Sequence, residues 1–425
     1  MKRSGLISLL GATLLSATAL AGGFANLDVG THRCGMMAVV ATGEDPTMIY
    51  HNPANMLEIE EDEALFASIN SVLVKTDIRI RYPDDSLSEN LEPTKYYGFV
   101  PFLGYTSDFG LERFKGGLAL YFPNLYGAAM PRESHTRYLV GEAYFITGYL
   151  TPAAAYRLTD WLSFGAGLDL IYVDIELQRA FNLALFREPV DFRNCDPDSD
   201  FWFTLTGDDE VLSWHAGLTA EPIDGLRLSA VYYEKAEITP EGEVDVDVPE
   251  QYGQDFTTFA EVGMLIPAAW RFGVSYELGE RWTFGFDYNW WRYSDYEYQE
   301  IKTGLADELG IDLDLSSDKN YTNSKNIGLG LQYRLNERWS LLAGWQQDWS
   351  PAPNRTYSLD NPNLSFIGYA LGAKYELGRR LRAEISYDLN NYERINVRNS
   401  ETFPPTNGTG DGLWHAVGLS LLYRL

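Results

Sequence analysis

Large apolar residues occupy every second position from Trp270 to Trp291, and this alternation constrains the fold more than any other feature of the sequence. The stretch reads WRFGVSYELGERWTFGFDYNWW, so aromatic or aliphatic side chains alternate with small or polar ones on both sides of Gly279-Glu280. Successive side chains of a β-strand point to opposite faces, so this period of two predicts two strands, each with one apolar and one polar face. The two residues between them predict a tight hairpin.

The same alternation recurs along the chain and predicts fourteen strands. It is clearest near the C-terminus, where Val417, Leu419, Leu421, Tyr423 and Leu425 share one face. An even number of strands closes an antiparallel barrel with both termini on one side. The predicted strands cover residues 63–82, 96–107, 114–123, 142–158, 161–180, 211–220, 226–238, 267–278, 281–297, 325–335, 338–349, 365–377, 380–391 and 413–425.

The links between the predicted strands alternate in length. Those after even-numbered strands are as short as Thr159-Asp160 and Asn336-Glu337, whereas those after odd-numbered strands are long and often acidic. Short periplasmic turns, long external loops and aromatic residues near strand ends are typical of an outer-membrane barrel. A soluble β-sandwich would not need so many tryptophans and tyrosines there. The sequence therefore predicts an all-β fold, a 14-stranded antiparallel transmembrane β-barrel in the outer membrane of a bacterial cell.

Two further segments precede the barrel. Lys2 and Arg3, an apolar run and the small residues up to Ala21 have the order of a secretory signal, which predicts a signal peptide over residues 1–21. Residues 22–60 carry Gly, Asp-Pro and Asn-Pro breakers and do not fit a strand, so we expect an N-terminal luminal hatch, or plug. Residues 61–425 would form the barrel. No later segment approaches the ~20 apolar residues of a spanning helix.

The composition argues against several other classes of protein. A formal net charge of -27 opposes nucleic-acid binding, which needs a basic footprint. Five His and two Cys offer little for a metal site, and no Ser/His/Asp arrangement is evident, so we predict no enzyme, no catalytic residue, no metal and no cofactor.

The cysteines and the acidic loops each leave two interpretations open. Cys34 could pair with Cys195 in the oxidising envelope, or both thiols could be free. The acidic stretches 196–200, 241–250 and 307–315 could bind Ca²⁺ or bridge to lipopolysaccharide through divalent ions, but they lack the spacing of a calcium loop. A solvated exterior that prevents self-association is the simpler interpretation.

Short motifs in a fixed order resemble the FadL/TodX family of outer-membrane transporters for long-chain fatty acids and aromatic hydrocarbons. The likeness covers nearly the whole mature chain, and it implies a fourteen-stranded barrel, an N-terminal hatch and a monomer that takes up hydrophobic molecules passively. The motifs are Gly23-Phe24, Gly35-Met36, Asp45-Pro46, Asn52-Pro53-Ala54, Pro152 with AYRL at 155–158, LSFGAG at 162–167, Ile266-Pro267, Arg281-Trp282-Thr283, and the segment from Gly344-Trp345 through PAP at 351–353 to Gly372.

The resemblance also implies a kink in the third strand that opens the barrel wall toward the membrane. We place it between Lys115 and Pro123, because Gly116 and Gly117 weaken strand order and Pro123 lacks a backbone donor. Alternatively, the glycines give room in a crowded lumen and Pro123 ends the strand. In the implied mechanism a ligand is captured among the external loops, enters the barrel and leaves sideways when the hatch shifts.

Three groups of residues are candidates for contact with the ligand or for control of the hatch. The Asn52-Pro53-Ala54 motif would form a rigid joint between hatch and first strand, although an ordinary Asn-Pro turn has the same sequence. Candidates for hydrophobic capture, which could instead pack within loops or form a girdle, are Phe122, Leu125, Tyr126, Phe201, Trp202, Phe203, Leu305 and Leu309. Candidates for binding a carboxylate, which could instead pair with Glu or Asp across strands, are Arg271, Arg334, Lys374 and Arg382.

Two other functions fit a barrel of this kind. A general diffusion porin would pass small hydrophilic solutes and would have no forty-residue plug. An adhesin or phage receptor would bind partners through its external loops without uptake. Pockets for fatty acids, alkanes and monoaromatics need the same residue types, so the sequence does not choose among these ligands.

Overall fold

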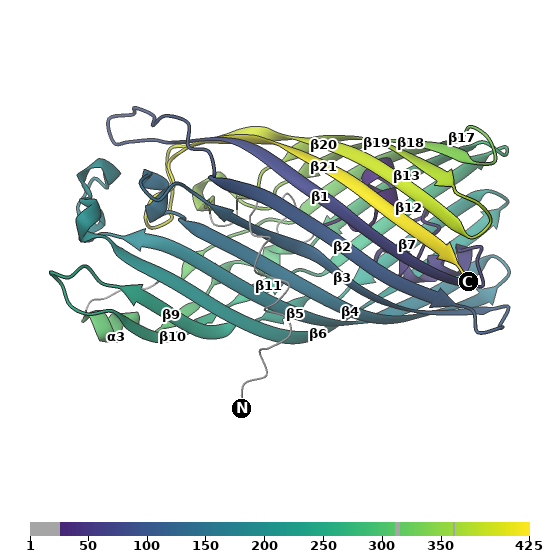
Figure 1. The fold of residues 1–425 in the computed structure, drawn as a ribbon, viewed down its shortest axis with the longest axis horizontal. Helices are drawn as coiled ribbons and strands as arrows, with labels where there is room; N and C mark the ends of the chain where they lie inside the picture. Colours follow the sequence, from purple (N-terminus) through teal and green to yellow (C-terminus); the bar gives the residue numbers. More distant parts are fainter. Residues whose placement is uncertain (1–25, 311–314, 360–361) are drawn as a thin grey trace.

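The computed structural model describes residues 26–310, 315–359 and 362–425. The predicted signal peptide lies outside these ranges, as do residues 311–314 of one acidic stretch. Within them, fourteen antiparallel strands pair in chain order and the last pairs with the first, which closes the barrel (Figure 1). These strands are β1 (Glu63–Ile80), β2 (Lys95–Ser107), β3 (Phe114–Ala129), β4 (Glu142–Thr159), β5 (Leu162–Phe181), β6 (Phe201–Ile223), β7 (Leu226–Tyr233), β12 (Ala269–Leu278), β13 (Trp282–Trp291), β17 (Ser324–Arg334), β18 (Trp339–Trp349), β19 (Phe366–Glu376), β20 (Leu381–Val397) and β21 (Gly408–Arg424).

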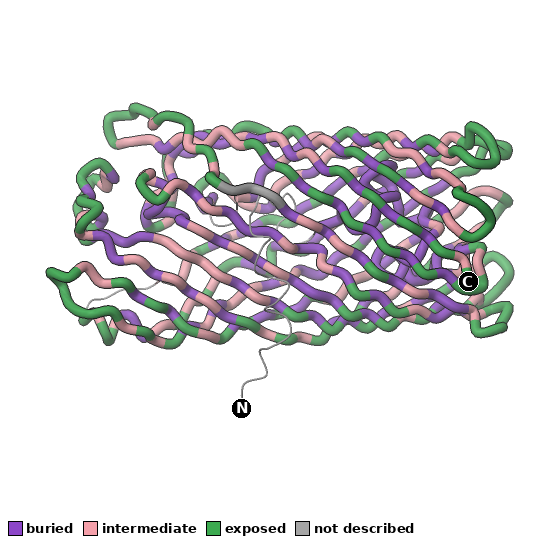
Figure 2. Tube along the Cα trace, viewed as in Figure 1, coloured by how far each residue is buried: buried purple, intermediate pink, exposed green. Residues whose placement is uncertain are grey.

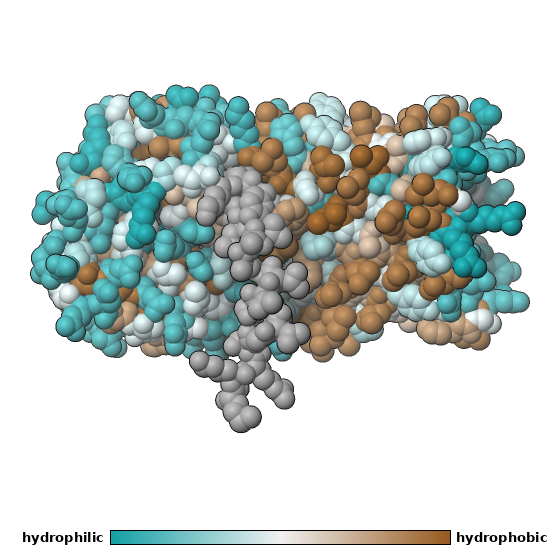
Figure 3. All heavy atoms as spheres, in the orientation of Figure 1, coloured by the Kyte–Doolittle hydropathy of each residue, from teal (hydrophilic) through white to brown (hydrophobic). Residues whose placement is uncertain are grey.

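The apolar face of each membrane strand points outward. In the β12–β13 hairpin, Trp270 and Phe272 are 42% and 43% exposed, whereas Arg271 and Asn289, which pair with each other, are 3% and 2% exposed. Figure 2 shows the same alternation along the other strands. In Figure 3 the apolar side chains gather over the half of the barrel that carries the C-terminus, and the other half is hydrophilic. This belt is the surface that a bilayer would cover.

The two ends of the barrel differ as predicted. The C-terminus and the short turns, such as those between β4 and β5 or β12 and β13, share one end, and the long loops share the other (Figure 1). At the long-loop end β6 extends beyond β7 and pairs with β9 (Glu241–Asp247), which continues the wall through β10 (Phe256–Val262) to β15 (Ile301–Thr303). No helix in the described part of the chain is long and apolar enough to cross a membrane.

Smaller elements fill the long loops. Two short pairs join β8 (Ala236–Ile238) to β11 (Met264–Ile266) and β14 (Tyr298–Gln299) to β16 (Ser317–Asp318). The loop helices are η2 (His135–Tyr138), η3 (Leu183–Phe186), η4 (Phe192–Asn194), η5 (Pro197–Ser199), η6 (Tyr293–Asp295), α3 (Leu305–Leu309) and η7 (Asn354–Thr356).

Several predicted strand boundaries were wrong. The seventh strand ends at Tyr233 rather than 238, the ninth ends at Trp291 rather than 297, the thirteenth continues past 391 to Val397, and the fourteenth begins at Gly408 rather than 413. The third strand continues past residue 123 to Ala129, and the sixth begins at Phe201 rather than 211. Beyond the membrane belt the outward face meets water, so the alternation inverts: Phe203 and Leu205 are buried, while Thr204 between them is not. A search for outward apolar residues therefore misses these extensions.

Residues 26–59, which we call the N-terminal segment, are almost entirely buried and lie against the inner face of the barrel near the short-turn end. The segment contains α1 (Thr31–Met36), α2 (Met48–His51) and η1 (Pro53–Glu58). It packs on lumen-facing glycines from several strands. A Cβ at Gly165 would overlap the Pro53–Ala54 peptide, and one at Gly328 would overlap the carbonyl of Met37. These glycines let backbone approach backbone.

Candidate functional site

A cavity of about 350 Å³, here called the outer cavity, lies between the long loops and the ends of β5 and β6. This volume falls within the range of small-molecule pockets, about 300–1,000 Å³. One side is polar and includes Lys319 and Arg179. Lys319 is only 6% exposed, and its ammonium forms no ion pair with a carboxylate of the described residues. The apolar wall includes Leu177, Phe181, Phe203, Leu205, Val244, Leu359 and Phe403.

A buried polar network fixes one wall of the outer cavity. Asp200, which precedes β6, pairs with the Arg137 guanidinium at 2.8 Å and accepts a hydrogen bond from the Tyr138 hydroxyl at 2.9 Å. Burial, together with the nearby Asp200 charge, raises the pKa of Tyr138 well above its ordinary value, so the hydroxyl stays protonated. Phe201 and Phe203 are thereby held on the inner face of β6.

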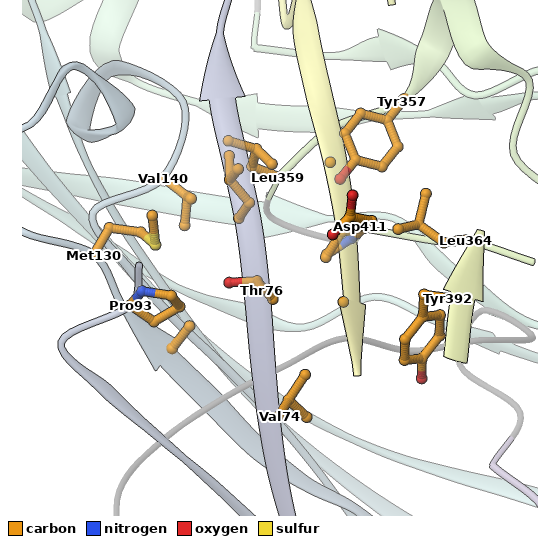
Figure 4. Close-up of a pocket in the computed structure, with 15 residues that line it drawn as sticks. Val74, Thr76, Pro93, Met130, Val140, Tyr357, Leu359, Leu364, Tyr392 and Asp411 are labelled. Atoms are coloured by element: carbon orange, nitrogen blue, oxygen red, sulfur yellow. The ribbon is translucent and has the colours of Figure 1, made fainter. Parts of the chain in front are cut away.

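The middle cavity is apolar and lies deeper, between β1, β3, β20, β21 and the loop residues Tyr357, Leu359, Pro362 and Leu364. It shares Leu359 with the outer cavity. In Figure 4, Pro93, Met130 and Val140 lie to one side of β1, and Leu364 and Tyr392 lie to the other. Its volume of about 40 Å³ is too small for a hydrophobic ligand. Passage through it therefore requires side chains or loop residues to move.

The inner cavity, of about 50 Å³, lies beside the N-terminal segment. The Tyr126 ring lies near it and packs edge-to-face on Trp414, with 6.0 Å between ring centroids. The inner cavity has an aromatic lining that is interrupted by polar and charged side chains. Its members include Tyr50, Tyr121, Tyr149, Tyr233, Trp291, Asn26, Asp169 and Arg271.

The wall of the barrel is irregular where the inner cavity meets β3. The register of β3 shifts between Tyr121 and Asn124 against β4, and opposite the Gly98 to Phe102 stretch of β2. Pro123 lies within this irregularity and cannot donate to the sheet. Asn26 of the N-terminal segment donates its side-chain amide to the Pro123 carbonyl at 2.7 Å. The inner cavity thus lies beside an irregular point in the wall, which the N-terminal segment contacts.

Comparison with known proteins identifies the family to which this architecture belongs. The family model described as outer membrane protein transport protein (OMPP1/FadL/TodX) matches residues 12–417. The chain belongs to this family. It is therefore an outer-membrane transport protein, which confirms the family, the fold class and the location expected from the sequence.

This FadL/TodX family member is also similar to individual named proteins. The chain is 22% identical over 374 residues to the long-chain fatty acid transport protein of Salmonella typhi, covering 81% of each. It is 20% identical over 278 residues to outer membrane protein P1 of Haemophilus influenzae, covering 60% of this chain and 57% of that protein.

Solved structures share the fold. The crystal structure of a Pseudomonas aeruginosa FadL homologue superposes with a TM-score of 0.79 at 16% identity, covering 95% of this chain and 99% of the other. The Pseudomonas putida toluene transporter TodX superposes with a TM-score of 0.71 at 17% identity, covering 96% and 100%.

The predicted hatch motif lies in the centre of the N-terminal segment. Asn52 accepts a hydrogen bond from the Ala54 amide at 3.2 Å and donates to the Val40 carbonyl and the Thr219 hydroxyl, both at 2.9 Å. Pro53 begins η1, where its missing amide proton costs nothing. The motif therefore ties two parts of the segment to each other and to β6.

The residues proposed for the kink and for capture separate into distinct places. Gly116 and Gly117 pair regularly with both neighbouring strands, and only Pro123 lies in the irregular part of β3. Phe122, Leu125 and Tyr126 all lie within β3, which continues past the predicted end of the third strand at residue 123. Phe201, Trp202 and Phe203 are the first residues of β6. Leu305 and Leu309 are the two ends of α3, in a long loop.

The four candidate cations differ in their surroundings. Arg334 is exposed at the short-turn end of β17, away from the buried lumen. Lys374 lies 3.6 Å from a carboxylate oxygen of Glu44, and Arg382 contacts the carbonyl of the same residue at 3.5 Å. Arg271 is buried in the inner cavity. No sequence signal singled out Lys319 or Arg179, since a cation in a long loop or near a strand end is common.

The remaining predictions concern cysteines and metals. The disulfide alternative was wrong: Cys34 and Cys195 are both free, because α1 lies near the short-turn end and Cys195 lies in a long loop. Across the described ranges, no three His, Cys, Asp or Glu side chains are grouped closely enough to hold a metal ion.

Proposed function

We propose that this protein takes up long-chain fatty acids passively across the outer membrane. The observation that carries the proposal is the outer cavity, which combines an aromatic and aliphatic wall with the ammonium of Lys319, a residue that is only 6% exposed. A buried charge without a counterion is costly, and a fatty-acid carboxylate would neutralise it while the acyl chain covers the apolar wall. A pure hydrocarbon would leave the ammonium unpaired. The name of the Salmonella typhi relative, a long-chain fatty acid transport protein, supports the same ligand class.

In this proposal the ligand moves from the outer cavity through the middle cavity to the inner one, and leaves sideways where β3 is irregular. The bilayer favours that exit, because each CH₂ removed from water gains ~0.8 kcal/mol. The middle and inner cavities hold only about 40 and 50 Å³, so side chains or loop residues have to move at the middle cavity and the N-terminal segment has to shift at the inner one for a ligand to pass. Residues 22–60 would thus act as the hatch, with Asn52-Pro53-Ala54 as its joint.

The proposal is favoured over the other functions considered. A general diffusion porin needs a water-filled lumen, but the N-terminal segment is buried within this one. An adhesin binds its partner through its external loops, so it has no need of cavities inside the barrel. Uptake requires no covalent step and no second subunit, so we propose that the protein is a monomer and not an enzyme. The acidic loops remain candidates for contact with lipopolysaccharide through divalent ions.

Binding measurements on the purified barrel test the fatty-acid ligand. We expect oleate to bind the wild-type protein and Lys319→Gln to lower its affinity about tenfold, the effect of losing one charge-assisted hydrogen bond. Lys325→Gln is the matched control, because Lys325 lies near the start of β17 outside the cavity lining, and its ammonium lies 4.6 Å from the centroid of the Trp349 ring. Binding of toluene with equal strength to wild type and Lys319→Gln, with no binding of oleate, would contradict the proposal.

A further inference from the structure

The guanidinium of Arg271 is a buried charge with incomplete partners. The side chain is 3% exposed, and its Nε and Nη1 atoms have no hydrogen-bond acceptor among the described residues. Its Nη2 donates to the Tyr50 hydroxyl at 3.0 Å. The guanidinium carbon lies 4.2 Å from the Tyr233 ring centroid and 4.9 Å from that of Tyr50. Aromatic faces partly offset the charge, but they accept no strong hydrogen bond.

The acidic side chains near the inner cavity are already engaged with other groups. Asp169 lies 2.8 Å from His215 and accepts from the Thr151 hydroxyl at 2.6 Å. Asp287 accepts the backbone amides of residues 39 and 40, at 2.7 and 3.1 Å. The Glu234 carboxylate accepts the hydroxyl of Tyr232 at 3.1 Å. None of these carboxylates forms an ion pair with Arg271 in the part of the chain that the structure describes.

An arginine does not lose its proton in a protein, so the charge persists and an anion is its natural partner. The inner cavity of about 50 Å³ has room for a carboxylate beside Arg271, but not for a long chain. It lies against the irregular part of β3, because Pro123 lines it as well. A head group held here would leave its acyl chain to extend toward the wall.

We propose that Arg271 forms a second carboxylate-binding site, at the inner end of the route and distinct from the outer cavity with Lys319. This inference rests on the proposed uptake of fatty acids. The ligand is an organic acid with an apolar tail, and its carboxylate accepts hydrogen bonds from the guanidinium between the rings of Tyr50 and Tyr233. An alcohol with the same tail gains nothing at this site, because it carries no charge.

The experiment compares decanoate with 1-decanol by calorimetric titration of the purified full-length barrel. In Lys319→Gln, which weakens the outer site, decanoate still binds more tightly than decanol, and adding Arg271→Gln removes that preference, a loss of about tenfold or more. Arg227→Gln is the matched control, since Arg227 lies on the adjacent strand β7 and is within 3.9 Å of three carboxylates, those of Glu58, Glu221 and Glu277. Arg271→Lys keeps part of the preference, because the charge remains.

Each result separates this inference from the proposed function. If Lys319→Gln alone abolishes the preference for decanoate, or if Arg271→Gln leaves it unchanged in that background, the inner site is refuted while fatty-acid uptake stands. If wild type binds neither probe, the proposed function fails as well. Retention of the fast-migrating folded band in unheated gels shows that each variant barrel has folded, and Arg271→Lys provides a second test should Arg271→Gln not fold.

Discussion

Asn26 connects the N-terminal segment to the irregular part of β3 through one side chain. Its side-chain amide donates to the Pro123 carbonyl at 2.7 Å and contacts the Tyr126 hydroxyl, while the backbone carbonyl of Asn26 accepts a hydrogen bond from the Tyr50 hydroxyl at 2.7 Å. Tyr50 in turn accepts from Arg271. A continuous set of hydrogen bonds therefore links the proposed inner site to Pro123.

We expect Asn26→Ala to speed the transfer of decanoate into lipid vesicles several-fold. The variant loses the hydrogen bond to Pro123, worth about 1 kcal/mol, so the closed arrangement of the segment at β3 is less favoured. Transfer is measured with a pH-sensitive dye inside the vesicles. Asn55→Ala is the control, because Asn55 holds the Val40 carbonyl at 3.0 Å and makes no contact with Pro123. Equal acceleration by both variants would show that general loosening, not the Pro123 contact, sets the rate.

The glycine at position 328 gives a second prediction at the scale of single residues. A Cβ there would overlap the Met37 carbonyl. Gly328→Ala should therefore destabilise the packing of the N-terminal segment against the barrel wall by about 1–3 kcal/mol. Amide hydrogen exchange in residues 26–59 should rise, while the melting of the barrel strands stays close to wild type. Gly410→Ala is the control, since its Cβ would lie at ordinary distances of 3.4 and 3.5 Å from Tyr357 and Ile395. Unchanged exchange in Gly328→Ala would contradict the role given to the glycines.

At the scale of elements, the sequence predicted the membrane strands well and the extramembrane ones poorly. The β12–β13 hairpin follows from its aromatic period of two, because lipid selects for outward apolar residues. The irregularity in β3 was only partly foreseeable: Pro123 marks it, but the register shift depends on how β2 and β4 pair around it, which Gly116 and Gly117 do not reveal.

Two long loops are joined by a contact that depends on pH. Asp84, between β1 and β2, lies 2.9 Å from Arg193, between β5 and β6. Hydrogen bonds from Ser86 and Arg193 lower the pKa of Asp84 from 3.8 to about 2. The folded pKa is depressed, so the contact is at full strength above pH about 4 and is lost as the pH falls through about 2. The exposed site is screened by solvent, so the effect on total stability is small.

We therefore expect hydrogen exchange in residues 82–94 to be slow and constant from pH 7 to pH 4, after correction for the intrinsic rate, and to rise below pH 3. Arg193→Gln should show the faster exchange already at pH 7, because the partner of Asp84 is gone. Exchange that rises between pH 7 and pH 5 would point instead to His135, whose pKa burial lowers.

At the scale of the whole molecule, closure of the barrel and the asymmetry of its ends follow from strand count and loop lengths. The positions and linings of the cavities do not follow from these features. The outer cavity brings together Arg179, Lys319 and Phe403, which are far apart in sequence and belong to β5 and two different loops. No local sequence pattern identifies such residues, since whether they line a cavity depends on which loops fold over the open end of the barrel. Arg271 could be placed on the lumen face, but its lack of a carboxylate partner appears only once its neighbours are known.

The barrel and the N-terminal segment should be separable. The closed set of strand pairings runs from β1 to β21 and back without using residues 26–59, so deletion of residues 22–55 from the mature chain should leave the wall intact. The deletion would expose lumen-facing polar groups such as Asn70, Asp287 and Asp388 to water, and water would fill the vacated space. In planar bilayers we expect stable ion-conducting steps from the deletion variant and none from wild type. Asn26→Ala keeps the segment and should not conduct, although it transfers decanoate faster. A deletion variant that inserts and folds but stays non-conducting would show that the loops, not the N-terminal segment, close the barrel to ions.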